Sequence, residues 1–282
     1  MLTFYLASTA TYGLQAAESL LAAGFSCLGV ITPPPKPVGR HQTLTPNPVH
    51  TWAQQKGLPI HFISPKITRE QLASLLPCDY LLVVDFGYFV PSWLIAHPRL
   101  LAVNIHPSAL PLWRGASPGQ AVILSRAPTS AVSIMTLAPV MDAGDLLAQI
   151  PFPVSSTWTA SDYYAHAFRL ACEHLPQVLT EFAAGTLTLT PQQGTPTFAP
   201  KINKTDAFIP WNDLTDPAHA AHIDAAIRAY TPWPHAWTLA PTATGDKRLQ
   251  LLSAHLEDGH LVIDTVKMEG KGVQNWPLTN TL

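Results

Sequence analysis

The first half of the chain alternates short apolar runs with segments whose apolar residues recur at helical spacing. The apolar runs predict strands at 2–7, 26–31, 60–63, 80–85, 101–105, 131–137 and 146–152. The helical spacing predicts helices at 13–23, 48–56, 69–76 and 161–184. Because strands that are apolar on both faces are typical of covered parallel sheets, we expect an α/β fold, with helices on both faces of a mostly parallel sheet.

The pattern changes after Gly185, where Thr, Pro, Gln and Gly dominate up to residue 203. Beyond this stretch, residues 218–230 are predicted to form a helix, and 249–256 and 260–268 two strands joined by a hairpin. We therefore expect three parts. They are a first domain at 1–188, a linker at 189–203 and a small β-rich C-terminal domain at 204–282.

Composition and charge exclude several classes of protein. The chain has 282 residues, of which 47% are hydrophobic and 12% charged, so a disordered chain is excluded. A net charge of -2 gives no general attraction for nucleic acid, and from Lys201 onward seven basic residues stand against nine acidic ones. No apolar window is long enough to cross a membrane and no signal-peptide pattern begins the chain, so we expect a cytoplasmic protein without a membrane partner.

The cysteines and histidines do not predict a metal site. Cys27, Cys78 and Cys172 lie far apart, each among apolar neighbours, which is typical of buried small side chains rather than of a disulfide framework. Most histidines have no spacing suited to shared ligation. We therefore expect no metal.

Three polar residues follow predicted strands and suggest chemistry. Asn104 and His106 end the apolar run that begins at Leu100, and Asp142 lies in a glycine-containing turn after the next strand. In parallel sheets, ligands bind beyond the carboxyl ends of the strands. A carboxamide for an oxyanion, an imidazole for a proton and a carboxylate to orient it suit acyl transfer to an amine. The alternatives are a structural His106 and an Asp142 that only stabilises its turn.

The residues around this trio carry a family resemblance. Asn-Ile-His-Pro-Ser-Ala-Leu-Pro at 104–111, Trp-Arg-Gly-Ala at 113–116 and Met-Asp-Ala-Gly-Asp at 141–145 resemble the signature of the 10-formyltetrahydrofolate-dependent formyltransferases. The Pro-Val-Gly-Arg run at 37–40 and Asp-Phe-Gly-Tyr at 85–88 are also similar to that family. Further similar segments lie at 201–204, 209–211, 227–230, 232–234 and 269–271, so the resemblance spans nearly the whole chain.

The resemblance implies a fold and an activity. It implies a Rossmann-like sheet followed by a shortened OB-like barrel, because only 45 residues follow Trp237. It implies transfer of a formyl group from the co-substrate 10-formyltetrahydrofolate to the amino group of initiator methionyl-tRNA in translation initiation, by a monomer. The alternatives are a formyltransferase acting on a nucleotide-linked amino sugar, and a non-catalytic folate- or RNA-binding relative. The presence of all three polar residues disfavours the last.

The resemblance also implies roles for individual residues. Asn104 and His106 would handle the formyl carbonyl and the attacking amine, and Asp142 would position His106. The implied folate-binding residues are Phe86, Gly87, Tyr88, Phe89, Val90, Ser108, Leu110, Pro111, Pro139, Val140 and Met141. The implied acceptor-binding residues are Lys36, Arg40, Arg114, Lys201, Lys204 and Lys271, with ordinary surface charges or, for Arg114, a structural role as the alternative.

The sequence departs from the family pattern in two places. The first strand ends in Ala-Ser-Thr-Ala at 7–10, where the family usually has a Gly-Thr-Pro turn, and Ala138 stands where an acidic residue is frequent. The first departure makes a close approach of a ligand to this turn less certain than in the family.

Overall fold

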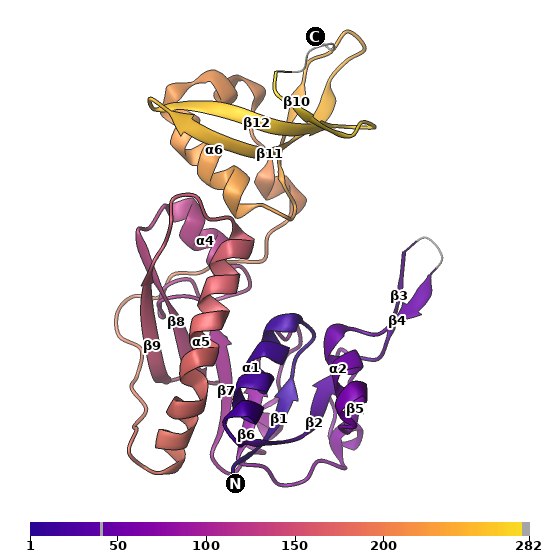
Figure 1. The fold of residues 1–282 in the computed structure, drawn as a ribbon, viewed down its shortest axis with the longest axis vertical. Coiled ribbons are helices and arrows are strands. Elements are labelled where there is room, and N and C mark those ends of the chain that lie inside the picture. The colour runs from indigo at the N-terminus through magenta and orange to yellow at the C-terminus, as the bar shows by residue number, and fades with distance from the viewer. Residues whose placement is uncertain (40–41, 278–282) are drawn as a thin grey trace. The chain divides into compact units, whose positions relative to one another are not determined.

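The central feature of the computed structural model, which describes residues 1–39 and 42–277, is a seven-stranded sheet. Its strand order is β5-β2-β1-β6-β7-β8-β9 (Figure 1). The pairs from β5 to β7 are parallel, whereas β7 and β8 are antiparallel. The strands are β1 (Thr3–Ala7), β2 (Ser26–Thr32), β5 (Ile60–Phe62), β6 (Tyr80–Val83), β7 (Leu101–His106), β8 (Thr129–Thr136) and β9 (Leu146–Pro153). The predicted mostly parallel sheet is therefore confirmed.

Helices cover both faces of this sheet, as its two-sided apolar strands require. The α-helices beside this sheet are α1 (Thr11–Ala22), α2 (Pro48–Lys56), α3 (Ser92–Ile95) and α5 (Ala160–Ala183). Two more, α4 (Pro118–Ser125) and α6 (Pro217–Ala229), belong to the second compact unit of the chain. On one face, the Tyr80 hydroxyl of β6 donates a hydrogen bond to the Leu179 carbonyl of α5 at 2.6 Å. On the other face, Leu81 and Val83 of β6 share a buried cluster with Leu94 of α3.

In two places in the first half of the chain, the secondary structure differs from the prediction. The helix predicted at 69–76 is only the 3-10 turn η1 (Glu70–Leu72). Its continuation is prevented because the Leu76 backbone N–H donates to the Tyr5 hydroxyl at 3.0 Å and a proline follows at position 77. The Pro-rich stretch after β2 also holds an unpredicted exposed hairpin, β3 (Lys36–Val38) with β4 (Thr43–Thr45).

A second sheet lies in the C-terminal part of the chain. It has four antiparallel strands, β10 (Ala236–Ala240), β11 (Lys247–Glu257), β12 (His260–Met268) and β13 (Val273–Asn275). The predicted hairpin between β11 and β12 is confirmed. Ile223 and Ile227 of α6 pack in one core with Leu249 and Val266 of this sheet. Two 3-10 turns, η2 (Lys204–Ala207) and η3 (Trp211–Thr215), precede α6.

The chain folds into two compact units. The first comprises Met1–Arg114, Ala131–Pro151 and His166–Pro196, and the second comprises Gly115–Ser130, Phe152–Ala165 and Thr197–Leu282. The predicted domain limits at 188 and 204 stay a prediction. Among the described residues, no helix combines the length and apolarity that a membrane crossing requires.

Candidate active site

The candidate site lies in the first unit, at the carboxyl end of β7. The parallel register pairs Val83 of β6 with Asn104 of β7, so the two strands end at the same edge of the sheet. Asn104 and His106 are two residues apart on one strand and therefore project from the same face. The sequence-predicted pair thus occupies the edge at which ligands bind in parallel sheets.

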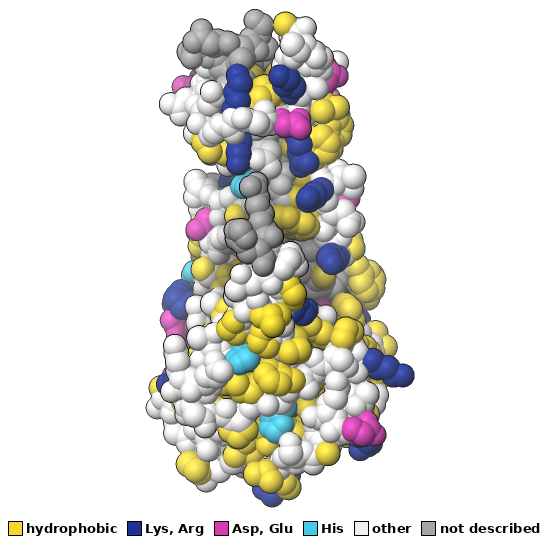
Figure 2. Space-filling model, turned by 90° about the vertical axis from the view of Figure 1, so that its right-hand side faces the viewer, with side chains coloured by type: hydrophobic (Ala, Val, Ile, Leu, Met, Phe, Trp, Pro, Cys, Tyr) yellow, Lys and Arg dark blue, Asp and Glu magenta, His cyan; other side chains and the backbone are white. Residues whose placement is uncertain are grey.

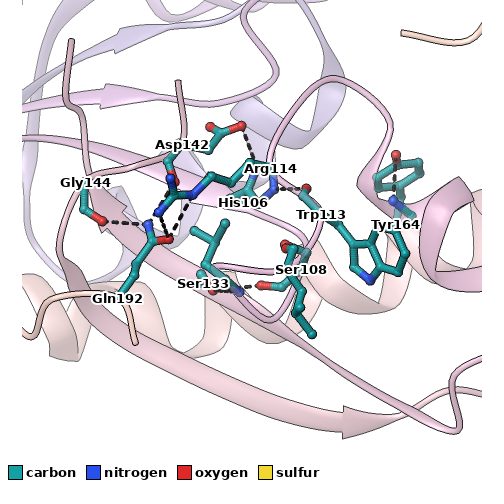
Figure 3. Close-up of polar contacts among 12 residues, drawn as sticks. His106, Ser108, Trp113, Arg114, Ser133, Asp142, Gly144, Tyr164 and Gln192 are labelled. Atoms are coloured by element: carbon teal, nitrogen blue, oxygen red, sulfur yellow. Dashed lines mark hydrogen bonds and ion pairs between the residues drawn. The ribbon is translucent and has the colours of Figure 1, made fainter. Parts of the chain in front are cut away.

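His106 is held at both ring nitrogens. The residue is buried, with 4% of its surface exposed, and Nε2 lies 2.9 Å from the carbonyl oxygen of Trp113 (Figure 3). Because a carbonyl only accepts hydrogen bonds, this contact places a proton on Nε2. Nδ1 lies 3.7 Å from Oδ2 of Asp142. A neutral His106 therefore keeps a lone pair on Nδ1, where an arriving proton would be stabilised by the neighbouring carboxylate.

Asp142 reaches His106 from a tight turn after β8. Its backbone has a φ of 51°, in the left-handed region that aspartate tolerates better than most residues. The Ala143 N–H donates to the Val140 carbonyl, and the Thr136 N–H of β8 donates to the Asp145 carbonyl at 2.8 Å. Gly144 completes the turn, since a Cβ there would lie 1.9 Å from the Thr136 carbonyl oxygen.

Asn104 is the third residue that the sequence singled out. It is half-buried, and its carboxamide makes no hydrogen bond within residues 1–39 and 42–277. A polar side chain at a strand end without an internal partner remains available to a ligand. Its amide can donate to an oxygen that becomes negatively charged.

The predicted folate-binding residues fall into an exposed and a buried group. Phe89, Val140 and Met141 expose 73%, 65% and 69% of their surfaces, although they are apolar. Exposed apolar side chains on two loops beside polar groups are typical of a binding site for a flat ring. The half-buried or exposed remainder comprises Phe86, Gly87, Tyr88 and Pro139, and the buried residues are Val90, Ser108, Leu110 and Pro111.

Ser108 and Leu110, two of these buried residues, help to fix the loop after β7. The Ser108 hydroxyl donates to the Leu112 carbonyl at 2.6 Å, and the Ser133 hydroxyl of β8 donates to the Ser108 carbonyl at 2.7 Å. The Gln149 side chain of β9 donates to the Leu110 carbonyl at 2.9 Å. These contacts fix the loop that carries Trp113, and through it the carbonyl that orients His106.

The predicted acceptor-binding residues are scattered, and one is not described. Lys36 of β3 donates to the Tyr88 hydroxyl at 3.1 Å, which links the hairpin to a predicted folate-binding loop. Arg40 lies outside the described residues. Arg114 is bound to Gln192 by two hydrogen bonds. In the second unit, Lys201, Lys204 and Lys271 are exposed and form no ion pair with any described residue.

Two residues that the sequence did not single out belong to this region. Gln192 bonds to the turn that carries Asp142, yet the surrounding Thr, Pro and Gln residues predict only a linker. Asp85 follows β6 with a left-handed φ of 47°. Desolvation by the surrounding protein atoms raises the pKa of its carboxyl, although part of the residue is exposed to solvent. Asp85 ends a predicted strand and begins the Asp-Phe-Gly-Tyr run that resembles the family, but the sequence assigns a role only to the three residues after it.

The residues of the site fit an organic ligand better than a metal. Within the described part of the chain, no three His, Cys, Asp or Glu side chains gather as metal ligands do. The donor set at the site is a carboxamide, an imidazole and a single carboxylate. This set can polarise a carbonyl and move one proton.

Comparison with known protein families gives two successive matches along the chain. The model of a family described as formyl transferase matches residues 11–179, which is more than half of the chain. A second, described as formyl transferase, C-terminal domain, matches residues 201–274. The first match contains Asn104, His106 and Asp142, and Gln192 lies in neither.

Solved structures share the fold at low sequence identity. A methionyl-tRNA formyltransferase from Clostridium thermocellum is 16% identical, with a TM-score of 0.64 over 95% of this chain and 99% of that one. An N-formyltransferase from Helicobacter canadensis, in complex with folinic acid and dTDP-3-aminofucose, is 18% identical, with a TM-score of 0.67 over 92% and 89%. HypX from Aquifex aeolicus is 17% identical, with a TM-score of 0.64 over 91% of this chain and 40% of that one. All three structures have the same architecture. The name of the first contains methionyl-tRNA, whereas the name of the second contains an amino sugar linked to a nucleotide, dTDP-3-aminofucose.

Proposed function

Because the chain belongs to the formyl transferase family, we propose that it transfers a formyl group from 10-formyltetrahydrofolate to a primary amine. One observation carries this proposal. The carboxamide of Asn104, which has no partner among the described residues, lies two residues from a buried His106 whose Nδ1 faces Oδ2 of Asp142 at 3.7 Å. No serine or cysteine nucleophile is needed, since the amine itself attacks the formyl carbon.

The chain's own residues divide the chemistry between them. When bound, the co-substrate supplies an activated formyl group. Asn104 donates its amide hydrogen to the formyl oxygen as the amine adds and that oxygen becomes negative. His106 accepts the proton of the amine at Nδ1, and Asp142 stabilises the resulting imidazolium. The ring can then return this proton to the departing nitrogen, which balances the transfer.

The exposed apolar side chains fit the folate part of the co-substrate. Phe89 lies on the loop after β6, and Val140 and Met141 lie on the turn that carries Asp142. A pterin ring needs apolar walls and a few fixed hydrogen bonds, and these two loops provide such walls next to the candidate catalytic groups. We propose that they hold the folate.

For the acceptor, we propose initiator methionyl-tRNA. A methionyl-tRNA formyltransferase shares the fold over nearly the full length of both chains. Figure 2 shows several Lys and Arg side chains on the viewed face of the second unit, with acidic side chains among them; such cations could face a phosphate backbone. Lys204, Lys247, Lys267 and Lys271 are among its exposed basic residues.

A nucleotide-linked amino sugar is the second candidate acceptor. The relative bound to dTDP-3-aminofucose shares the fold equally well. The seven basic and nine acidic residues from Lys201 onward also give the second unit no net positive charge for RNA. A competition assay separates the two acceptors.

The assay supplies 10-formyltetrahydrofolate with methionyl-tRNA and dTDP-3-aminofucose at equal concentration. We expect formyl-methionyl-tRNA as the main product, lost in His106→Ala and Asp142→Ala. His255→Ala serves as the matched control, because His255 is an exposed residue of the second sheet that also faces a carboxylate, Asp264 at 2.9 Å, and it is distant from the site residues in the sequence. Formylated amino sugar alone would make the second candidate correct, and no formylated amine from either acceptor would refute the proposed activity.

A further inference from the structure

Gln192 uses every hydrogen-bonding atom of its side chain within the candidate site. Its Nε2 donates at 2.8 Å to the carbonyl of Asp142 and at 2.8 Å to that of Gly144. Its Oε1 accepts from Arg114, at 3.1 Å from Nε and 2.7 Å from a terminal nitrogen (Figure 3). One carboxamide therefore joins the turn that carries Asp142 to the guanidinium of Arg114.

The backbone holds Gln192 in place for this contact. Thr190 and Leu146 exchange two backbone hydrogen bonds, of 2.8 and 2.9 Å, which fix the segment against the start of β9. Gln192 follows two residues later and is half-buried. The stretch predicted as a linker is thus anchored to the sheet at this point.

The turn that Gln192 holds is strained. Asp142 has a φ of 51°, a left-handed conformation that is uncommon outside glycine and persists where surrounding contacts enforce it. Gln192 donates to the carbonyls of Asp142 and Gly144, on either side of Ala143, and its side chain therefore fixes the backbone of the turn. Without it, the turn can relax, and the carboxylate of Asp142 can move away from Nδ1 of His106.

We propose that Gln192 is a positioning residue for formyl transfer, which fixes the carboxylate of Asp142 against His106 and orients Arg114. This inference rests on the proposed function. Gln192 acts through Asp142 and needs no contact with either substrate. The two donor hydrogens are the essential feature, since only they reach the turn.

Two variants of Gln192 and one matched control test this role. Gln192→Met keeps the length and removes all four hydrogen bonds. Gln192→Glu keeps an acceptor for Arg114 but cannot donate to the two carbonyls. The control is Gln193→Met, because the neighbouring Gln193 is exposed and, among the described residues, its side chain hydrogen-bonds only to the Pro191 carbonyl, at 3.4 Å.

The expected kinetic signature is a fall in kcat with little change in KM. A displacement of about 1 Å at a catalytic group costs on the order of 100-fold in rate, so both Gln192 variants should lose about that factor in kcat. The KM for 10-formyltetrahydrofolate should stay within about threefold. In an Asp142→Asn background, adding Gln192→Met should cost little more, because the residue through which it acts is already altered.

A second readout does not depend on turnover. The ring 15N chemical shifts of His106 report the hydrogen bonding of each nitrogen, so the Nδ1 shift should move in both Gln192 variants and stay unchanged in Gln193→Met. If the wild-type chain formylates no amine, the proposed function fails while this spectrum still tests the positioning.

Three results would overturn the inference. The first is an unchanged His106 spectrum in a folded Gln192 variant. The second is a change in KM with kcat unaltered. The third is a further fall of about 100-fold in kcat when Gln192→Met is added to Asp142→Asn. The last would show that Gln192 acts independently of Asp142.

Discussion

Replacing Gly144 with alanine should displace the carboxylate of Asp142 while leaving every candidate catalytic side chain present. A Cβ at position 144 would lie 1.9 Å from the carbonyl oxygen of Thr136 and 2.7 Å from the carbonyl carbon of the same residue. Real Cβ contacts essentially never fall below 3.0 Å. The atoms must therefore separate by at least 3.0 − 1.9 = 1.1 Å. Thr136 pairs with Val103 inside the sheet, so the exposed turn has to give way.

This shift carries Asp142 away from His106, since the two positions belong to one turn. A misplacement of about 1 Å costs on the order of 100-fold in rate, so kcat/KM for formyl transfer should fall by about that factor. If the bond from the Thr136 N–H to the Asp145 carbonyl is also lost, stability should fall by about 1 kcal/mol, which leaves the chain folded.

The assay compares steady-state formyl transfer and urea unfolding of wild type, Gly144→Ala and Gly272→Ala. Gly272 is the matched control, because a Cβ there meets no atom of the described residues within 4 Å and its backbone is not left-handed. A Gly144→Ala variant that is folded and within about threefold of wild-type activity would refute the reasoning that the position of this turn controls the reaction.

Three further predictions concern stability and reactivity. Desolvation raises the pKa of Asp85 above its ordinary value of 3.8, so the charged carboxylate destabilises the folded chain. Asp85→Asn should therefore raise Tm at about pH 7, and this gain in Tm should shrink as the pH falls toward about 4. A gain in Tm that does not depend on pH would exclude desolvation of the carboxylate as its cause. Tyr80→Phe removes the 2.6 Å bond to the Leu179 carbonyl and should cost about 1 kcal/mol in urea unfolding, so equal stability would show that the bond contributes nothing. Burial raises the pKa of Cys27 and Cys78 to about 11, so a disulfide reagent at pH 8 should modify them only after denaturation; rapid reaction of the native chain would contradict their burial.

The parts of the fold that the sequence predicts are those whose pattern is set by burial. The run before Asn104 is apolar on both faces because β7 is covered on both sides, and the change to polar residues marks its end. The two β-like runs at 249–256 and 260–268, with the Glu-Asp-Gly junction between them, likewise predict β11 and β12, and one face of that sheet packs on α6. Asp142 was found because its turn is glycine-containing and follows a predicted strand.

The parts that the sequence misses depend on contacts between distant segments. Gln192 is 50 residues from Asp142 along the chain, and no local pattern shows that its amide bonds to that turn. The helix expected at 69–76 is shortened because Tyr5, from another strand, takes the Leu76 N–H. The left-handed backbone conformation of Asp85 and Asp142 cannot be predicted from the sequence either, because aspartate also adopts ordinary backbone conformations.

The most direct test of the central claim is a single-turnover measurement of formyl transfer from 10-formyltetrahydrofolate to methionyl-tRNA by wild type and Asn104→Ala. The side chain of Asn104 makes no hydrogen bond within the described residues, so its removal should leave the fold and the binding of folate unchanged. Wild type should form formyl-methionyl-tRNA, and the variant should be slower by on the order of 100- to 1,000-fold, the loss that follows removal of one oxyanion donor. Equal rates for the two proteins would contradict the assignment of Asn104 to the developing charge.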